Sequence, residues 1–399
     1  MKRTMSINRV SILTLLLGSL LMVNSCKNDL EINAPYDAKP IVYALLNPYD
    51  SIQYIKVVKS FLGEENPETY AGIADSSQFN TVEGYVDEYL DGVKINTYPL
   101  QATQLNNKKP GIFASPNQTL YTFKTNLVSG TATYLNTNSE FEIRAKLNGT
   151  IDINSRTKMI VDAPSFFYQQ SVRQQLWKKP GNTKSQGTIK FASSSQMLEG
   201  LKLEAELPVN CKMAKMKMIF YYKEILTGPN GCTEELKSIE YDMGTITVTD
   251  PNKLNKENFA ITSERFFEKI SNGMLDAGDV PNFYRRVADR CDFEIIMGDD
   301  DFYSYIQVTK PSDDLNQNKP QFSNIENGFG IFGCRIITRL SQQTLRVNYE
   351  DLSGLLDSHT QNELITGALG GGTGAKGFCM DPEIAAGSSY GSLKCEQCK

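Results

Sequence analysis

The feature that most constrains this chain is a pair of alternating runs joined by Asp91-Gly92. Residues 82–89 and 93–98 mix apolar and polar side chains in alternation, and many of the apolar ones are β-branched or aromatic. Alternation places every second side chain on one face, which is the pattern of a half-buried β-strand. Asp-Gly suits a two-residue hairpin turn because both positions accept positive φ. An antiparallel hairpin is therefore predicted here.

Similar short runs recur along most of the chain. They cover residues 41–46, 52–61, 120–123, 141–145, 159–161, 188–191, 201–207, 213–222, 238–243, 283–297 and 303–308. Strands at this spacing, with turn signals between them, favour antiparallel sandwiches. The predicted fold class is mainly β, with tandem antiparallel β-sandwich domains. An immunoglobulin-like sandwich is expected over residues 40–163, and a second β-rich domain over 164–350.

One helix is expected to interrupt the second domain, near residues 263–275. Thr262 is a suitable N-cap, and Glu264 lies favourably in the first turn. The apolar side chains recur at helical spacing before Gly278, at Phe266, Phe267, Ile270 and Met274.

The segment 351–399 changes character and is rich in glycine and small residues. Such a composition buries little apolar surface, so a loose or partner-dependent tail is expected. Residues 370–376 contain a glycine cluster followed by Lys376, but the Gly-Lys-Ser/Thr of a phosphate loop is missing and no strand precedes it.

The amino terminus has the organisation of an export signal. A basic start precedes the apolar run 12–23, which is shorter than the ~20 residues that span a bilayer core. The run ends just before Cys26, where the sequence resembles the lipobox of bacterial lipoproteins. The resemblance implies a signal peptide over 1–25 and acyl chains on Cys26. An ordinary secretory peptide with an incidental cysteine is the alternative.

Residues 26–39 are polar and contain a proline, so they are expected to form a tether between the anchor and the first domain. The chain holds 41 Lys and Arg against 46 Asp and Glu, a net charge of −5. This acidic balance, without a long basic run, argues against nucleic acid as the partner.

The chain contains eight cysteines. Outside the inner membrane disulfides can persist. Cys395 and Cys398 have the spacing of half a zinc site or of a redox CxxC, but no strand-helix frame supports either interpretation. A terminal disulfide between these two cysteines, or a frayed end of the chain, is favoured over both interpretations.

Side chains suited to catalysis are scarce. His359 is the only histidine, which argues against catalytic triads and histidine-rich zinc sites. Asp299, Asp300 and Asp301 offer oxygen ligands for calcium, although they lack EF-hand spacing and a solvated turn is the alternative. Trp177 is a candidate platform for a ligand or partner, or else an anchor in the core or at a domain junction. No catalytic residue and no cofactor are predicted.

Two segments carry a resemblance to a family. Residues 41–63, which include Ser51, and residues 322–333 resemble uncharacterised lipoproteins of the Bacteroidota with a domain of unknown function. The resemblance implies a β-rich outer-membrane lipoprotein, often associated with TonB-dependent transporters. Asp29 and Glu31 resemble the acidic surface-export signals of that phylum, and Asp50-Ser51-Ile52 matches its O-glycosylation motif.

These observations lead to one functional hypothesis and two alternatives. We expect a non-enzymatic, lipid-anchored binding or accessory subunit of the outer membrane, exposed at the cell surface, which works with a membrane partner such as a TonB-dependent transporter. A structural or adhesive surface lipoprotein is the first alternative. A glycan hydrolase is the second, and it requires two carboxyl groups facing a cleft lined by aromatic side chains.

Overall fold

The computed structural model describes most of the chain beyond residue 37. The described residues are 38–61, 66–162, 165–168, 174–175, 189–309, 322–340, 355–380, 382–386 and 388–395. Strands account for 48% of the residues and helices for 17%, with several antiparallel sheets. The predicted mainly-β, sandwich-rich fold class is therefore confirmed.

The largest sheet contains nine of the described strands. Eight follow the order β13-β12-β15-β16-β1-β2-β6-β5, and β17 pairs with β15. Its neighbours are antiparallel except β1 with β16 and β15 with β17, which are parallel. The bounds are β1 (Pro40–Leu46), β2 (Ile52–Lys59), β5 (Gln101–Leu105), β6 (Gln118–Lys124), β12 (Met213–Gly228), β13 (Gly231–Thr247), β15 (Phe283–Gly298), β16 (Phe329–Leu340) and β17 (Phe378–Cys379).

A four-stranded sheet of order β4-β3-β7-β8 completes the sandwich. Its strands are β3 (Val82–Leu90), β4 (Val93–Pro99), β7 (Glu140–Leu147) and β8 (Ile151–Lys158). Asp91 and Gly92 have φ angles of 51° and 78° between β3 and β4, so the predicted hairpin turn is confirmed. Side chains of both sheets belong to one buried core, including Val42, Leu46, Val86, Phe141 and Ile143.

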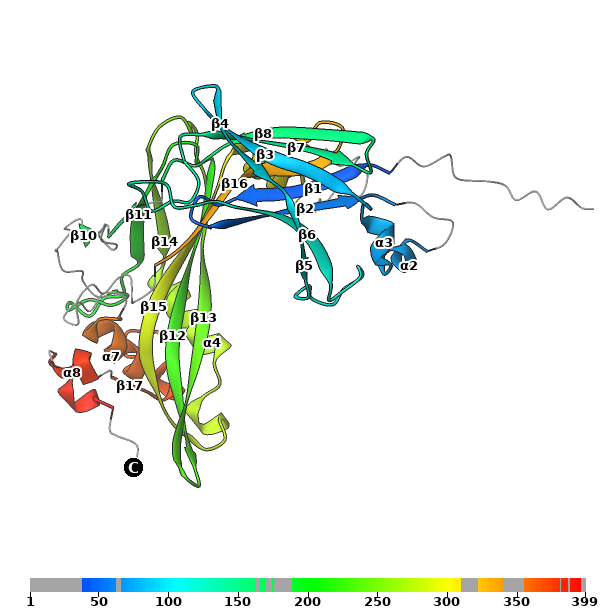
Figure 1. The fold of residues 1–399 in the computed structure, drawn as a ribbon. Helices are drawn as coiled ribbons and strands as arrows, with labels where there is room; N and C mark the ends of the chain where they lie inside the picture. Colours follow the sequence, from blue (N-terminus) through cyan, green and yellow to red (C-terminus); the bar gives the residue numbers. More distant parts are fainter. Residues whose placement is uncertain are drawn as a thin grey trace, which may run out of the picture.

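A second arm extends from the sandwich. Figure 1 shows the sandwich at the top and the long strands β12, β13 and β15 running downward from it. A further sheet, of order β10-β9-β11-β14, lies beside this arm. Its strands are β9 (Ser165–Tyr168), β10 (Gln174–Gln175), β11 (Leu201–Leu207) and β14 (Asn255–Ile261).

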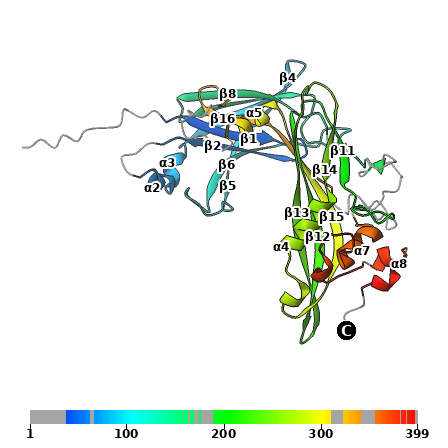
Figure 2. The same cartoon turned by 180° about the vertical axis from the view of Figure 1, so that it is seen from behind.

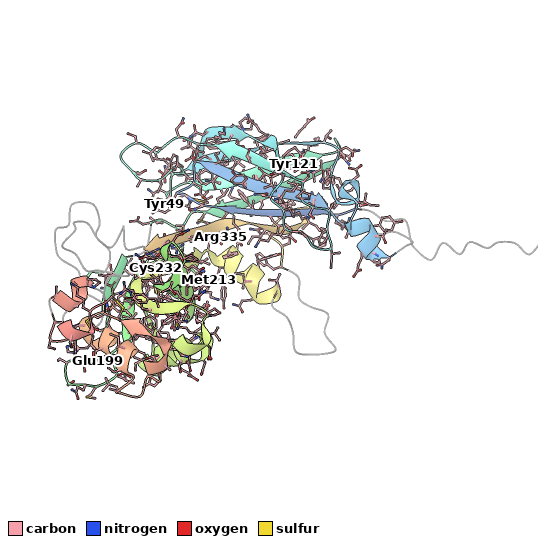
Figure 3. All side chains as sticks on the ribbon, turned by 90° about the horizontal axis from the view of Figure 1, so that it is seen from below. Tyr49, Tyr121, Glu199, Met213, Cys232 and Arg335 are labelled. Carbon is pink, nitrogen blue, oxygen red and sulfur yellow. A yellow bond between two sulfur atoms is a disulfide. The ribbon has the colours of Figure 1, made fainter. Side chains whose placement is uncertain are left out.

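Strand β16 joins the two arms. One part of it pairs with β1 of the sandwich, from Ile41 opposite Phe329 onward, and its other end pairs with β15. The large sheet therefore runs across the predicted boundary at residue 163. Figure 3 shows Arg335 of β16 at the junction, between the sandwich, which carries Tyr49 and Tyr121, and the arm, which carries Met213 and Cys232.

Near the start of β16, Gly330 lies where two strands approach closely. Gly330 has a φ angle of 110°, and a Cβ at this position would come within 1.9 Å of the carbonyl oxygen of Val42. Only glycine allows the two backbones to approach so closely. The following residues Ile331 and Phe332 are buried, as expected for a core strand.

Helix α4 (Ser263–Gly273) also agrees with the prediction. The side chain of Thr262 accepts a hydrogen bond from the backbone N–H of Arg265, and Phe266, Phe267 and Ile270 are buried. The structure contains further helices that the sequence did not predict. These are α2 (Pro67–Ala71), α3 (Ala74–Ser77), α5 (Asp300–Thr309), α7 (Ser358–Thr366) and α8 (Pro382–Ala386), with 3-10 turns η1 (Ala277–Asp279), η2 (Gly374–Lys376) and η3 (Gly391–Leu393).

The strand predicted over 303–308 is wrong, because these residues lie in helix α5. Asp299 precedes the helix, and its carboxylate accepts a hydrogen bond from the N–H of Phe302 at 2.8 Å. Capping of the free N–H groups, together with packing of α5 on β15 and β16, overrides the β-propensity of the sequence. Figure 2 shows α5 lying over β16 and β1.

The prediction of a loose carboxyl-terminal tail is wrong for residues 355–380. Helix α7 ends at Gly367, and the buried carboxylate of Glu363 accepts hydrogen bonds from the N–H groups of Leu369 and Gly371. The hydroxyl of Thr373 donates to the carbonyl of Glu363 at 3.0 Å. The glycine segment has few apolar side chains to bury, and hydrogen bonds to its backbone hold it in place instead.

Candidate functional site

A cavity of about 650 Å³ lies at the corner between the sandwich and the long arm. We call it the corner cleft. Strands β7 and β8 form one wall, two loops of the arm form another, and the start of α5 forms the third. The lining residues are Glu140, Arg156, Thr157, Lys158, Asn210, Lys212, Pro251, Asn252, Asp299, Asp300 and Asp301.

Backbone contacts hold the loops of the arm in place. The N–H of Lys212 donates to the carbonyl of Gly298 at the end of β15, at 2.8 Å. The side-chain amide of Asn210 donates to the backbone carbonyl of Met159, also at 2.8 Å, so this loop is tied to the sandwich as well. The cleft walls are therefore fixed relative to one another by hydrogen bonds between distant segments.

Asp299 lies at the base of the cleft and connects three elements. One carboxylate oxygen accepts from the N–H of Phe302, and the other accepts from the N–H of Cys334 at 2.6 Å and from the hydroxyl of Thr157 at 3.1 Å. These donors belong to α5, β16 and β8. The side chain is buried, with 6% of its residue surface exposed.

Burial raises the pKa of Asp299 to about 7, although its three hydrogen-bond donors favour the charged form. Desolvation disfavours a buried carboxylate, and here it outweighs the donors. Burial also raises the pKa of Asp301. Near neutral pH, Asp299 can therefore hold or release a proton while it maintains the contacts between the three elements.

Basic side chains line two walls of the cleft, with Arg156 and Lys158 on β8 and Lys212 in a loop of the arm. Arg156 contacts Glu140 at 3.5 Å and Glu142 at 3.0 Å, while Lys158 contacts Glu140 at 3.4 Å. Lys212 lies 5.9 Å from the ring centre of Tyr303. The cleft thus presents positive, negative and amide groups together, which is an arrangement suited to a polar ligand with both signs of charge.

The calcium hypothesis for Asp299, Asp300 and Asp301 is not supported. Asp299 uses its oxygens to cap α5 and to bind β8 and β16, while Asp300 is exposed to solvent. Among the described residues, no group of three or more His, Cys, Asp or Glu side chains has a metal-binding arrangement. The local sequence did not reveal that the first of these carboxylates is directed into the protein.

The predicted Cys395–Cys398 disulfide is wrong. Cys395 pairs with Cys379, at a Cα–Cα distance of 5.1 Å, and Cys398 lies outside the described residues. The folded tail brings β17 beside residue 395, which the sequence spacing did not indicate. Cys232 is also disulfide-bonded.

The free cysteines Cys211, Cys291 and Cys334 are buried. Burial raises the pKa of the Cys211 thiol to about 12 and also raises those of Cys291 and Cys334. The thiolate is the reactive form of cysteine, so these three side chains are chemically inert at neutral pH.

Other candidate residues lie apart from the cleft. Ser51 is exposed just before β2, which leaves its glycosylation as a prediction. His359 on α7 forms a hydrogen bond between its Nδ1 and the hydroxyl of Tyr390, at 3.0 Å. Cys26 and Trp177 lie outside the described residues.

The carboxylates of the cleft also bear on the hydrolase alternative. Glu140, Asp300 and Asp301 line the cleft, but the described lining residues include no aromatic side chain on which a sugar ring would stack. Sequence reasoning found the three aspartates but missed Arg156 and Lys212, because they come from distant strands and loops. Arg156 stands between the polar residues Ser155 and Thr157, so the local sequence carried no clear signal for it.

Comparison of the sequence with protein-family models finds no match, and comparison with curated proteins finds no match either. Among the described residues, no helix combines the length and apolarity needed to cross a bilayer.

Proposed function

We propose that this protein is a lipid-anchored binding or accessory subunit of the bacterial outer membrane, exposed at the cell surface. Acyl chains on Cys26 hold it at the membrane, and it works with an integral membrane partner such as a TonB-dependent transporter. The lipobox-like sequence supports the anchor. The resemblance to Bacteroidota lipoproteins supports the class of partner.

The corner cleft is the observation that carries the binding role. Its walls come from both arms, and its lining includes the basic Arg156, Lys158 and Lys212 together with the acidic Glu140, Asp300 and Asp301. Charges of both signs at one site favour recognition of a polar segment with a complementary charge pattern. A polar loop of the membrane partner is the proposed occupant.

Confinement to the membrane strengthens this contact. A lipid-anchored protein diffuses in two dimensions, so its effective concentration near a membrane partner is higher than in solution. More than one acyl chain is needed for a durable anchor, because a single chain gives only reversible attachment. The proposed function therefore requires both the modification of Cys26 and the charges of the cleft.

Copurification tests the proposal. Tagged protein is isolated from detergent-solubilised outer membranes, and its partners are identified by mass spectrometry. We expect an integral barrel protein with the unaltered chain and its loss with the double variant Arg156→Glu, Lys212→Glu. The control variant Lys253→Glu changes an exposed lysine near the cleft and should retain the partner.

Cell fractionation tests the anchor separately. The variant Cys26→Ser should move from the membrane to the soluble fraction while the folded arms remain unchanged. Retention of this variant in the outer membrane would contradict lipid anchoring. Absence of any barrel protein with the unaltered chain would contradict the accessory role.

A further inference from the structure

A second cavity lies on the outer face of the sandwich, away from the corner cleft. Strand β1 alternates, so Val42 and Ala44 point into the sandwich core while Ile41 and Tyr43 point outward. Val58 of β2 lines the same cavity. Tyr43 is 40% exposed, which is unusual for an aromatic residue in the middle of a large sheet.

The cavity is partly enclosed, and much of its lining is apolar. Helix α3 and the segment 108–119 form its walls, and its volume is about 290 Å³. Figure 1 shows α3 beside the ends of β1 and β2. Phe61 and Phe113 contribute further apolar surface. This volume is at the lower end of the ~300–1,000 Å³ of small-molecule sites, so it suits one narrow ligand.

Three lysines surround this apolar cavity. Lys56, Lys59 and Lys108 all line it, and none of its described lining residues is an aspartate or glutamate. Such a cluster is notable in a chain with a net charge of −5. An apolar surface whose charged residues, among the described lining, are all lysines is complementary to an apolar molecule that carries a negative charge.

The lysine charges are held near the cavity. The ammonium of Lys108 donates to the carbonyl of Ala114 at 2.8 Å and lies 5.4 Å from the ring centre of Phe113. Burial and the nearby charge of Lys108 lower the pKa of Lys56. Two ammonium groups repel one another here, and a bound anion relieves that repulsion.

We propose that this cavity binds an anionic amphiphile that consists of a single unbranched acyl chain and a carboxylate. The chain lies against Ile41, Val58 and Phe113, and the carboxylate contacts the ammonium groups of Lys56 and Lys108. Lysine is suited to such a place because its long apolar stem lines the cavity while its charge stays at the edge. The site is independent of the corner cleft, since the two share no lining residue.

Calorimetric titration with dodecanoate tests this inference. The full chain carrying Cys26→Ser is used, because this change removes the proposed lipid without altering the cavity. We expect one dodecanoate to bind per chain. The uncharged dodecanol and the cationic dodecyltrimethylammonium should bind at least about tenfold more weakly, because they lack a charge-assisted hydrogen bond to lysine.

Two variants locate the site. Lys56→Gln should weaken dodecanoate binding about tenfold, and Ala74→Trp should abolish it by filling the cavity. Lys124→Gln is the matched control, because this lysine is exposed at the end of β6 and does not line the cavity. Thermal unfolding of each variant checks that the fold is retained.

The outcomes separate the possible occupants. Equal binding of dodecanoate and dodecanol would show that the cavity selects only apolar chains and would overturn the inference, as would undiminished binding in Ala74→Trp. Absence of dodecanoate binding to the unaltered cavity would overturn it as well. None of these results depends on the copurification of a membrane partner.

Discussion

At the scale of single residues, Asp299 shows how one side chain links distant parts of this protein. Its carboxylate contacts Thr157, Cys334 and Phe302, which belong to three different elements. The hydrogen bonds favour the charged form and burial favours the neutral form. Because burial outweighs the donors, the pKa of Asp299 rises from 3.8 to about 7.

This shift predicts a pH-dependent contribution to stability. The folded protein retains the Asp299 proton at pH values where the unfolded chain has lost it, so the free energy of unfolding falls as pH rises from about 4 to about 7. Relative to Asp299→Asn, the unaltered protein should lose up to about 4 kcal/mol over this range. Urea unfolding at a series of pH values measures the difference.

The neighbouring side chain provides the control for this experiment. Asp300 is exposed, so Asp300→Asn should leave the pH profile of stability close to that of the unaltered protein. A stability difference between the unaltered protein and Asp299→Asn that does not change with pH would show that Asp299 does not titrate in this range.

At the scale of elements, the carboxyl-terminal segment is folded by polar contacts. Arg286 of β15 is buried and donates to the carboxylate of Glu224 at 2.6 Å and 2.8 Å. It also donates to the carbonyls of Leu275 and Lys376, at 2.9 Å and 2.7 Å. The ammonium of Lys376 in turn donates to the carbonyl of Met274. One guanidinium therefore connects the long arm to the tail.

Arg286→Met tests this connection. The change removes one of the two basic partners of the buried Glu224 carboxylate, the other being Lys237, and it leaves the carbonyls of Leu275 and Lys376 without their donor. It should lower the free energy of unfolding by about 3 kcal/mol. It should also speed cleavage of the segment 363–380 in limited proteolysis, because the tail loses an anchor. Denaturant unfolding and proteolysis followed by mass spectrometry provide the two measurements.

Arg265→Met is the matched control for the arginine change. Arg265 is exposed on α4, so its replacement should alter neither the stability nor the cleavage pattern appreciably. Unchanged proteolysis of the tail in Arg286→Met would mean that the tail is held independently of this arginine.

At the scale of the whole molecule, strand β16 makes the two arms one structure. It pairs with β1 in the sandwich and with β15 in the long arm, and Gly330 allows the close approach to Val42. A continuous sheet transmits local disruption to both sides, because the strands share backbone hydrogen bonds and a common core. The arms are therefore expected to unfold together.

Gly330→Ala should destabilise both arms at once. A Cβ would overlap the Val42 carbonyl, and the φ angle of 110° is unfavourable for alanine, so a loss of about 3 kcal/mol or more is expected. Hydrogen exchange should accelerate in β3 and β7 of the sandwich and in β12 and β13 of the arm. Gly278→Ala is the control, because a Cβ there meets no atom within 4 Å. Faster exchange in only one arm would contradict this coupling.

Some features of the fold were predictable from short stretches of sequence. The hairpin at Asp91-Gly92 and the cap of α4 at Thr262 were both predicted and are confirmed. These features depend on the conformational preferences of a few adjacent residues. Alternation likewise identified strands such as β2, in which every second side chain is buried.

Strand β8 shows where this reasoning fails. The sequence predicted a strand over 159–161, whereas the structure places it at Ile151–Lys158. Two of its inward positions are Ser155 and Thr157, whose hydroxyls donate to the carbonyl of Asn324 and to Asp299. Their polarity concealed the alternation, and their partners lie far away in the chain.

The sequence by itself therefore determined the mainly-β class, the turns and the caps, since each follows from local backbone preferences and from which side chains avoid water. Tertiary structure alone decided the helix at α5, the folded tail, the Cys379–Cys395 disulfide and the corner cleft. Each of these depends on groups from separate segments meeting in space. Hydrogen bonds and burial then overrule local propensity, because a buried polar group must find a partner wherever the fold supplies one.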